Sequence, residues 1–350
     1  MISESKIIHG LALETVKTFG SESVDCVITS PPYFQLRDYG FPEQWGLEPT
    51  YQEYLEHLWS LFDEIHRVLK PGGTCWVNLG DSFSGAAGGL WDKDPNPGSC
   101  NAIARIKKQA TVNYPPKCLL LIPHRFAIGM IERNWILRND IIWAKPNGMP
   151  ESVTDRFSKK HEFIFFFVKQ QKYYFDLDAI RKPLKESSIQ LLSQPNIENQ
   201  AGSERIPGKT NGNMKAVGGT KISKSDCENY GSPRAGNQRD GASVSEGHFL
   251  GSNPGDVSDF WDITTKPSLA KHYATFNSEL IDKPLIAGCP EGGIVLDPFC
   301  GTATTVARAI QLGRTGIGID GSSEYVKTAR KNIAQSLSAI DLFRSNKGEV

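Results

Sequence analysis

The sequence lacks any apolar run close to the roughly 18 residues that a membrane-spanning helix needs, and it begins without a basic-then-apolar signal segment. We therefore expect a soluble, cytoplasmic protein with no membrane partner. The chain also lacks an excess of charge of either sign, with 39 basic and 39 acidic residues. This balance argues against a protein that coats nucleic acid indiscriminately. It leaves room for a local basic cleft, because binding depends on where the charges lie.

The sequence also lacks CxxC pairs, histidines at metal-ligand spacing and the P-loop motif. None of the seven cysteines forms a CxxC pair, so we interpret them as reduced thiols of an intracellular protein. The seven histidines show no metal-ligand spacing, and we expect no metal site. The full P-loop pattern GxxxxGK(S/T) is absent, which disfavours the binding of nucleoside triphosphates.

What the sequence does contain is an alternation of apolar runs with segments of helical period. Val24–Thr29 and Thr74–Leu79 are typical of buried strands, and Tyr51–Leu69 between them has the 3.6-residue period of a helix that Pro71–Gly73 ends. Further strands are expected at 6–9, 136–143, 163–168, 293–296 and 315–319, and further helices at 12–18, 118–133, 278–287, 304–312 and from 323. The pattern predicts an α/β fold with a largely parallel sheet covered on both faces.

A change in composition divides the chain. Residues 184–256 are rich in Gly, Ser, Asn and Lys and poor in apolar side chains, so they cannot bury a core of their own. We expect this segment to be an insertion between two halves of one domain, residues 1–183 and 257–350. We interpret it as a target-recognition segment because of its position and its basic residues, which include Lys209, Lys215, Lys221, Lys224, Arg234 and Arg239.

A glycine turn, Asp297–Thr304, follows the apolar run Ile294–Leu296 and opens a helix. Ligands of parallel sheets bind at the carboxyl ends of strands, where glycine lets the backbone approach them closely. The next strand ends at Asp320, nineteen residues after Gly301. An acid at this place can accept both hydroxyls of a ribose. The order strand, turn, helix, strand, acid favours a nucleoside cofactor over an ordinary strand–helix corner.

A proline turn, Ser30–Tyr33, follows the strand Val24–Thr29, so it is expected at the same edge of the sheet as the glycine turn. Prolines leave carbonyl oxygens without partners along such a segment, and these oxygens and the Ser30 hydroxyl can accept hydrogen bonds from an amino group. Tyr33 offers a flat face on which a planar ring can stack. Taken alone, in an arbitrary protein, this motif is more typical of a structural Pro-Pro turn.

The two turns together resemble the DNA amino-methyltransferases of the permuted (beta) type, in which the catalytic turn Ser/Asn/Asp-Pro-Pro-Tyr/Phe/Trp precedes the cofactor turn Asp-Pro-Phe-x-Gly-x-Gly-Thr. A third family element, a His-x-Ala-x-Phe stretch before the cofactor turn, resembles His272–Phe276. The resemblance leaves residues 184–256 unmatched. It implies a Rossmann-like, seven-stranded, mostly parallel methyltransferase sheet with one reversed strand.

The resemblance also implies S-adenosyl-L-methionine as cofactor and a flipped base of double-stranded DNA as substrate. By that resemblance the base is held by the proline turn, that is by Ser30, Pro31, Pro32 and Tyr33. The implied cofactor-binding residues are Thr275, Phe276, Asp297, Pro298, Phe299, Gly301, Thr302, Thr304 and Asp320.

Three positions depart from the family pattern. Ala303 replaces the second glycine of the glycine turn, so the backbone there has φ below zero or is strained. Asn277 stands where proline is common. Leu11 stands where the family often has an aspartate that reaches the adenine amino group, so adenine recognition requires another acceptor.

In the family that the chain resembles, serine as the first residue of the proline turn favours the N4 amino group of cytosine, whereas Asp-Pro-Pro-Tyr favours adenine N6. We therefore expect a site-specific cytosine-N4 methyltransferase of a restriction–modification system, with adenine N6 as the alternative. No Pro-Cys pair is present, which disfavours methylation of the cytosine ring carbon. From another class, a nucleic-acid-binding protein with weak catalysis would keep the fold. A cognate restriction endonuclease is a candidate partner, and the sequence leaves monomer and homodimer open.

Overall fold

The computed structural model describes residues 4–84, 114–148, 150–180, 258–265 and 277–347. The 184–256 segment, Thr275 and Phe276 lie outside these ranges, and the three-part division of the chain stays a prediction. The described residues up to 180 and from 259 onward belong to one compact unit. None of the helices in these ranges combines the length and the apolar character needed to cross a membrane.

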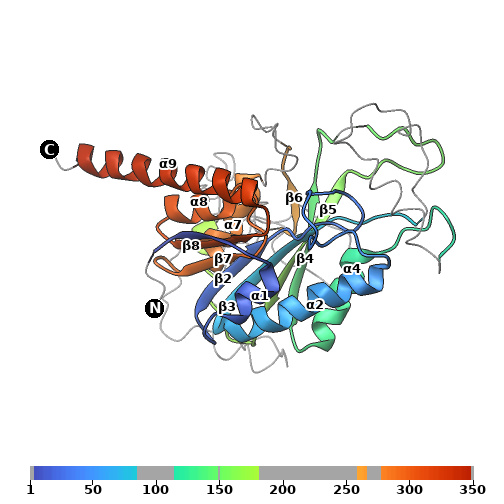
Figure 1. Cartoon of the computed structure of the whole chain (residues 1–350), viewed down its shortest axis with the longest axis horizontal. Coiled ribbons are helices and arrows are strands. Elements are labelled where there is room, and N and C mark those ends of the chain that lie inside the picture. The colour runs from blue at the N-terminus through green and yellow to red at the C-terminus, as the bar shows by residue number, and fades with distance from the viewer. Residues whose placement is uncertain (1–3, 85–113, 149, 181–257, 266–276, 348–350) are drawn as a thin grey trace, which may run out of the picture. The chain divides into compact units, whose positions relative to one another are not determined.

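One eight-stranded sheet runs through this unit, in the order β1-β8-β7-β2-β3-β5-β4-β6 (Figure 1). Its strands are β1 (Lys6–His9), β2 (Val24–Thr29), β3 (Leu69–Leu79), β4 (Ile136–Ala144), β5 (His161–Val168), β6 (Phe260–Asp262), β7 (Ile294–Asp297) and β8 (Thr315–Asp320). Only β5 of these strands is reversed, pairing antiparallel with β3 and β4. The predicted α/β class with one reversed strand is confirmed. The described sheet has eight strands instead of seven, because short β6 extends it beside β4.

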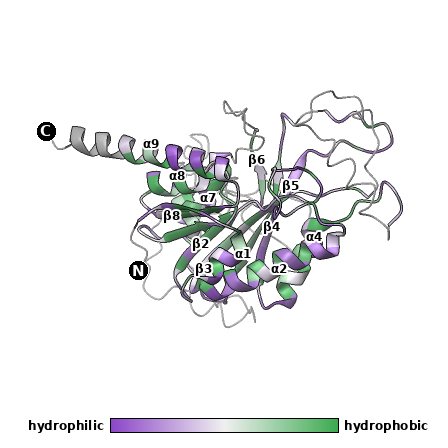
Figure 2. Ribbon diagram, in the orientation of Figure 1, coloured by the Kyte–Doolittle hydropathy of each residue, from purple (hydrophilic) through white to green (hydrophobic). Residues whose placement is uncertain are grey.

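Helices cover both faces of the sheet (Figure 1). They are α1 (Ala12–Lys17), α2 (Tyr51–Val68), α4 (Ile122–Glu132), α7 (Ser278–Gly288), α8 (Thr304–Gln311) and α9 (Ser323–Lys347), with a short 3-10 turn at Asp178–Ile180. The helices show apolar and polar stripes in Figure 2, and the central strands are mostly apolar. This is the pattern of a parallel sheet whose two faces are both buried.

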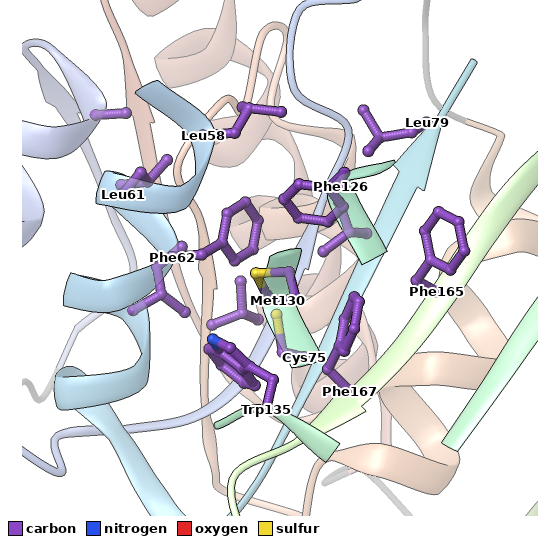
Figure 3. Packing of buried hydrophobic residues seen from close by; sticks show 14 of the residues in the cluster. Leu58, Leu61, Phe62, Cys75, Leu79, Phe126, Met130, Trp135, Phe165 and Phe167 are labelled. Carbon is purple, nitrogen blue, oxygen red and sulfur yellow. The ribbon is translucent and has the colours of Figure 1, made fainter. Parts of the chain in front are cut away.

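The two faces of the sheet receive alternate side chains of the same strands. Phe165 and Phe167 of β5 join one core with α2 and α4, where Phe62 and Phe126 pack edge-on at 5.1 Å between ring centroids (Figure 3). Phe166 of β5 joins a second core on the opposite face, with residues of α7. This alternation is the two-residue period of a strand. Strand β5 is therefore packed against a core on each face of the sheet.

Two element boundaries differ from the sequence prediction. Pro71–Gly73 does not end α2 but lies inside β3, because the β2–β3 register shifts between Val24 and Cys26 and leaves room for the extra residues. A Cβ at Gly73 would come within 2.8 Å of the Asp25 carbonyl oxygen, so glycine is required there. Helix α4 begins at Ile122 rather than at 118, because Leu121 before it is left-handed, with φ of 55°.

The strand order fixes where the carboxyl ends meet. Strand β2 lies between β7 and β3, and β7 lies between β8 and β2. The connection from β2 to β3 and the connection from β7 to β8 therefore run in opposite directions along the sheet. Ligands of α/β sheets bind outside the carboxyl ends of strands at such a switch point. The proline turn follows β2 and the glycine turn follows β7, which places both at this point.

Candidate active site

A cavity of about 460 Å³ opens at this edge of the sheet. Its walls include all of Ser30–Tyr33 from the proline turn. They also include Asp297, Pro298, Phe299, Gly301, Thr302 and Thr304 of the glycine turn, together with Asp320 at the end of β8. The structure therefore brings together every site residue predicted from the sequence except Thr275 and Phe276, which lie outside the described ranges.

A buried hydrogen bond joins the two turns at their strand ends. The Thr29 hydroxyl donates to Asp297 Oδ1 at 2.8 Å, and the Phe299 amide donates to the same oxygen at 3.1 Å. The Asp297 side chain is almost fully buried, and this desolvation raises its pKa to about 6 although both hydrogen bonds oppose the shift. A carboxyl group with such a pKa changes charge close to neutral pH, which is typical of functional sites.

The glycine turn is tied to β8 through Asp320. Asp320 Oδ2 accepts from the Gly301 amide at 2.9 Å, and Oδ1 accepts from the Ser322 amide at 2.8 Å. Burial raises the pKa of this carboxyl as well. Each carboxylate oxygen can accept a second hydrogen bond, so Asp320 still has acceptor capacity for a hydroxylated ligand on the cavity side.

Ala303 adopts the strained alternative at the departure from the family pattern. Its φ of 65° and ψ of 35° are left-handed, and its side chain is fully buried. This conformation costs an alanine about 1–2 kcal/mol relative to a right-handed one. The turn keeps its glycine-like shape in spite of the added methyl group.

Aromatic side chains outside the two turns also line the cavity. Tyr39, Phe41 and Tyr325 all reach the cavity, and a Cβ at Gly321 would come within 2.7 Å of the Phe41 ring. Leu11 also lines the cavity and contributes an apolar side chain rather than an acceptor. The aromatic residues within 33–45 are visible in the sequence, but only the fold shows that most of them line the cavity.

Tyr33 is held at its hydroxyl by a polar network. The hydroxyl donates to Glu162 Oε2 at 2.7 Å and lies 3.1 Å from Asn78 Oδ1. Lys145 pairs with the other oxygen of Glu162, and its ammonium nitrogen lies 4.1 Å from the centroid of the Trp143 ring. Burial and the Glu162 charge raise the Tyr33 pKa well above its usual value, so the hydroxyl stays protonated.

The Tyr33 ring is also held by packing. Gly80 follows β3, and a Cβ there would come within 2.6 Å of Tyr33 Cε2. The ring therefore rests against a glycine while its hydroxyl is bonded to Glu162. No local sequence pattern identifies Asn78, Lys145 and Glu162 as neighbours of the proline turn, because only the pairing of the strands brings them beside it.

The charges in the cavity fit the cofactor that the resemblance implies. S-adenosylmethionine carries a sulfonium and an ammonium group, a carboxylate and a ribose diol. The cavity offers the carboxyl groups of Asp297 and Asp320, and a buried Nη1 of Arg37 that lacks a hydrogen-bond partner within the described ranges. An unpaired buried donor of this kind fits an anionic group. The described residues contain no cluster of three or more His, Cys, Asp or Glu side chains that could hold a metal.

Comparison with known proteins places the chain among DNA methylases. The sequence model of the N6/N4 family, described as DNA methylase, matches residues 24–331. Type II methyltransferase M.Cfr9I of Citrobacter freundii is 33% identical over 329 residues, covering 94% of this chain and 87% of the relative. Type II methyltransferase M.SmaI of Serratia marcescens is 32% identical over 328 residues, covering 94% and 90%.

Solved structures share the fold at low sequence identity. The PvuII DNA methyltransferase, named as cytosine-N4-specific, superposes with a TM-score of 0.57 at 16% identity, covering 94% of this chain and 86% of its own. A protein of Thermus thermophilus, named as a DNA modification methylase and complexed with S-adenosyl-L-methionine, superposes with a TM-score of 0.52 at 19% identity. The match covers 95% of this chain and 94% of that protein.

Proposed function

The chain belongs to the N6/N4 DNA methylase family, and we propose that it transfers a methyl group from S-adenosyl-L-methionine to the N4 amino nitrogen of cytosine in double-stranded DNA. The observation that carries this proposal is the 2.8 Å bond between Thr29 and Asp297, which sets the proline turn beside the glycine turn in one cavity. The Ser-Pro-Pro-Tyr form of the turn supports cytosine over adenine. The PvuII enzyme, which shares the fold, is named as specific for the same target.

We assign the cofactor to the glycine-turn side of the cavity. Asp297 would attract its cationic methionine part, Asp320 would accept the ribose hydroxyls, and Phe41 and Tyr325 would flank the adenine. Leu11 cannot bond the adenine amino group, so apolar and aromatic contact replaces that bond. When bound, the cofactor supplies an electrophilic methyl group.

We assign the base to the proline turn. The Pro32 carbonyl already accepts a hydrogen bond from the Tyr54 hydroxyl at 2.8 Å. The acceptors for the base amine are therefore the Ser30 hydroxyl and the carbonyl oxygens of Ser30 and Pro31. Acceptors for the amine protons favour loss of conjugation with the ring, which frees the nitrogen lone pair to attack. The base must leave the duplex stack first, because its amino nitrogen is otherwise out of reach.

Tyr33 would stack against the extruded ring, and Glu162 would act on the reaction only through Tyr33. The bond from the Tyr33 hydroxyl to Glu162 and the contact with Gly80 restrict the ring from two directions. A preformed stacking surface lowers the entropy cost of holding the base in line with the methyl group. Glu162 is thus a positioning residue.

The target base is tested by methylating plasmid DNA with the purified protein and S-adenosyl-L-methionine. Hydrolysis to nucleosides followed by mass spectrometry should give N4-methylcytosine, and single-molecule sequencing of the same DNA should give its context. N6-methyladenine would replace the cytosine proposal by its alternative. Absence of any methylated nucleoside, together with no heat on titration with the cofactor, would favour a nucleic-acid-binding protein without catalysis.

We further propose that the chain is the modification enzyme of a restriction–modification pair, since its relatives are named as Type II methyltransferases. DNA methylated by the protein should then resist a restriction endonuclease of the same specificity. If every endonuclease of that specificity still cleaves fully methylated DNA at the modified site, the proposed restriction–modification role is wrong.

A further inference from the structure

Phe157 is the most exposed large apolar side chain among the described residues, with 97% of its surface open to solvent. It lies in the connection between β4 and β5, residues 145–160. The two ends of this connection are at the active site, because Lys145 and Glu162 both line the cavity. The connection extends beyond the strand ends (Figure 1). Isolated exposed apolar residues are common on protein surfaces. A function for Phe157 therefore depends on how its backbone is held and on the charges of the residues around it.

The backbone that carries Phe157 is held firmly. The Arg156 guanidinium lies 4.2 Å from the centroid of the Phe83 ring, pairs with Glu151 at 2.6 Å and donates to the Phe157 carbonyl at 3.1 Å. Phe83 itself is fixed by a β-bridge to Leu119. The apolar side chain is therefore displayed by a braced loop and needs little ordering when it meets a partner.

A second brace ties the loop to the wall of the active site. The Lys159 ammonium donates to the Asp81 carbonyl at 2.8 Å, and the Lys145 amide donates to the Lys160 carbonyl at 2.8 Å. Asp81 follows Gly80, the residue against which the Tyr33 ring rests. Phe157 is thus linked through a short chain of contacts to the proposed base site.

The charge around Phe157 suits a polyanion. Residues 145–160 contain four basic and two acidic side chains. Both acids are paired with cations, Glu151 with Arg156 and Asp155 with Lys117. Lys160 is exposed beside them. The segment therefore combines an exposed apolar side chain with a net positive charge. This combination matches the side chains that proteins insert between base steps of DNA while nearby cations contact the phosphates.

We propose that Phe157 is a wedge that enters the base stack of the DNA duplex at the target and occupies the space that the flipped base leaves. This inference rests on the proposed function, because a base must leave the stack for the wedge to be useful. Filling the gap offsets part of the cost of unstacking and unpairing, and it slows return of the base. The loop extends from the same sheet edge as the cavity, so one approach of the duplex serves both.

The test compares Phe157→Ala with wild type on two short duplexes that carry the recognition sequence read by single-molecule sequencing. One is fully paired, and the other has an abasic site opposite the target base, which removes the pairing that the wedge must overcome. We expect kcat/KM of Phe157→Ala to fall about tenfold or more on the paired duplex and less than about threefold on the abasic one. The matched control is Ile128→Ala on α4, where Ile128 is 57% exposed, and it should match wild type on both.

If kcat/KM of Phe157→Ala falls equally on both duplexes, or falls on neither, the proposal that Phe157 is a wedge is wrong. Phe157→Trp should retain most of the paired-duplex activity, because it also presents a ring that can stack. A second readout separates this inference from the proposed function. The fluorescence of 2-aminopurine at the target position should rise on binding to wild type and rise less with Phe157→Ala, whether cytosine, adenine or no base is methylated.

Discussion

The Thr29 hydroxyl at the end of β2 donates a 2.8 Å hydrogen bond to Asp297 at the end of β7, across 268 positions of the sequence. The bond is buried, so it is stronger than a solvent-exposed one and resists fluctuation. It joins the proline turn, the proposed base site, to the glycine turn, the proposed cofactor site. In-line transfer between two bound molecules depends on this kind of fixed distance.

The pH dependence of cofactor binding should follow Asp297. Because burial raises its pKa to about 6, the carboxyl is protonated in acid and charged above pH 6. The charged form attracts a cationic ligand, so the cofactor dissociation constant should fall as pH rises from 5 to 7. Isothermal titration from pH 5 to 7 measures this constant, and Asp297→Asn should bind the cofactor more weakly and with little pH dependence. If the dissociation constant of the variant changes with pH as much as that of the wild type, a group other than Asp297 is responsible.

The stability of the empty protein should change in the opposite direction. The folded state holds the Asp297 proton more tightly than the unfolded chain, whose aspartates titrate near pH 4. Burial of the charged form therefore opposes folding increasingly as pH rises from about 4 through 6, and the contribution is constant above this window. Asp297→Asn should lack this component when urea unfolding is measured from pH 4 to 7.

Tyr33→Ala should abolish most methyl transfer and leave the cofactor dissociation constant within about twofold, because we propose that the ring stacks on the base and does not bind the cofactor. Asp320→Ala should do the reverse and raise that constant. Single-turnover methylation and cofactor titration measure the two effects. A fully active Tyr33→Ala protein would refute the stacking role.

Glu162→Gln should lower the single-turnover rate about tenfold, because the Tyr33 hydroxyl loses a charged acceptor and the ring loses one restraint. Tyr33→Phe should cause a similar loss. If Glu162 acts only through the hydroxyl, the double variant should be no slower than either single one. Additive losses would instead give Glu162 an independent role.

Gly80→Ala should slow methyl transfer by displacing the Tyr33 ring, since the added Cβ would lie 2.6 Å from Cε2. The control is Gly72→Ala in β3, the strand that Gly80 follows, where an added Cβ meets nothing closer than 4.0 Å. Rates are compared after circular dichroism shows both variants folded. Equal rates for Gly80→Ala and wild type would show that the ring moves without consequence.

Ala303→Gly should change the free energy of unfolding by less than about 1 kcal/mol, because relief of the left-handed strain offsets the flexibility and the buried methyl contact that are lost. Ala309→Gly, at a buried position inside α8, should cost about 1–2 kcal/mol. Urea unfolding of both variants provides the comparison. A loss at Ala303 as large as that at Ala309 would mean that the turn carries no strain.

Deletion of residues 200–245 should abolish site-selective methylation and preserve cofactor binding, if the 184–256 segment reads the target. Its basic residues suit phosphate contacts. Sequencing of methylated DNA and cofactor titration measure the two properties. Methylation of the same sites by the shortened protein would place target recognition elsewhere in the chain.

The sequence by itself determined the fold class and the family. The alternation of apolar runs with helical periods required a parallel sheet between helices, because each element must bury its apolar side. The proline and glycine turns were recognisable because each is a contiguous run of residues whose backbone shape depends on proline and glycine. Both runs line the cavity.

Only the tertiary structure decided which other residues share that cavity. Glu162 reaches Tyr33 because reversed β5 pairs with β3, and Gly80 meets the same ring because it follows β3. Such contacts arise from strand order and register, and these depend on the packing of the whole core rather than on any local pattern. For the same reason the sequence could state two alternatives for Ala303, φ below zero or strain, and the folded turn adopts the second.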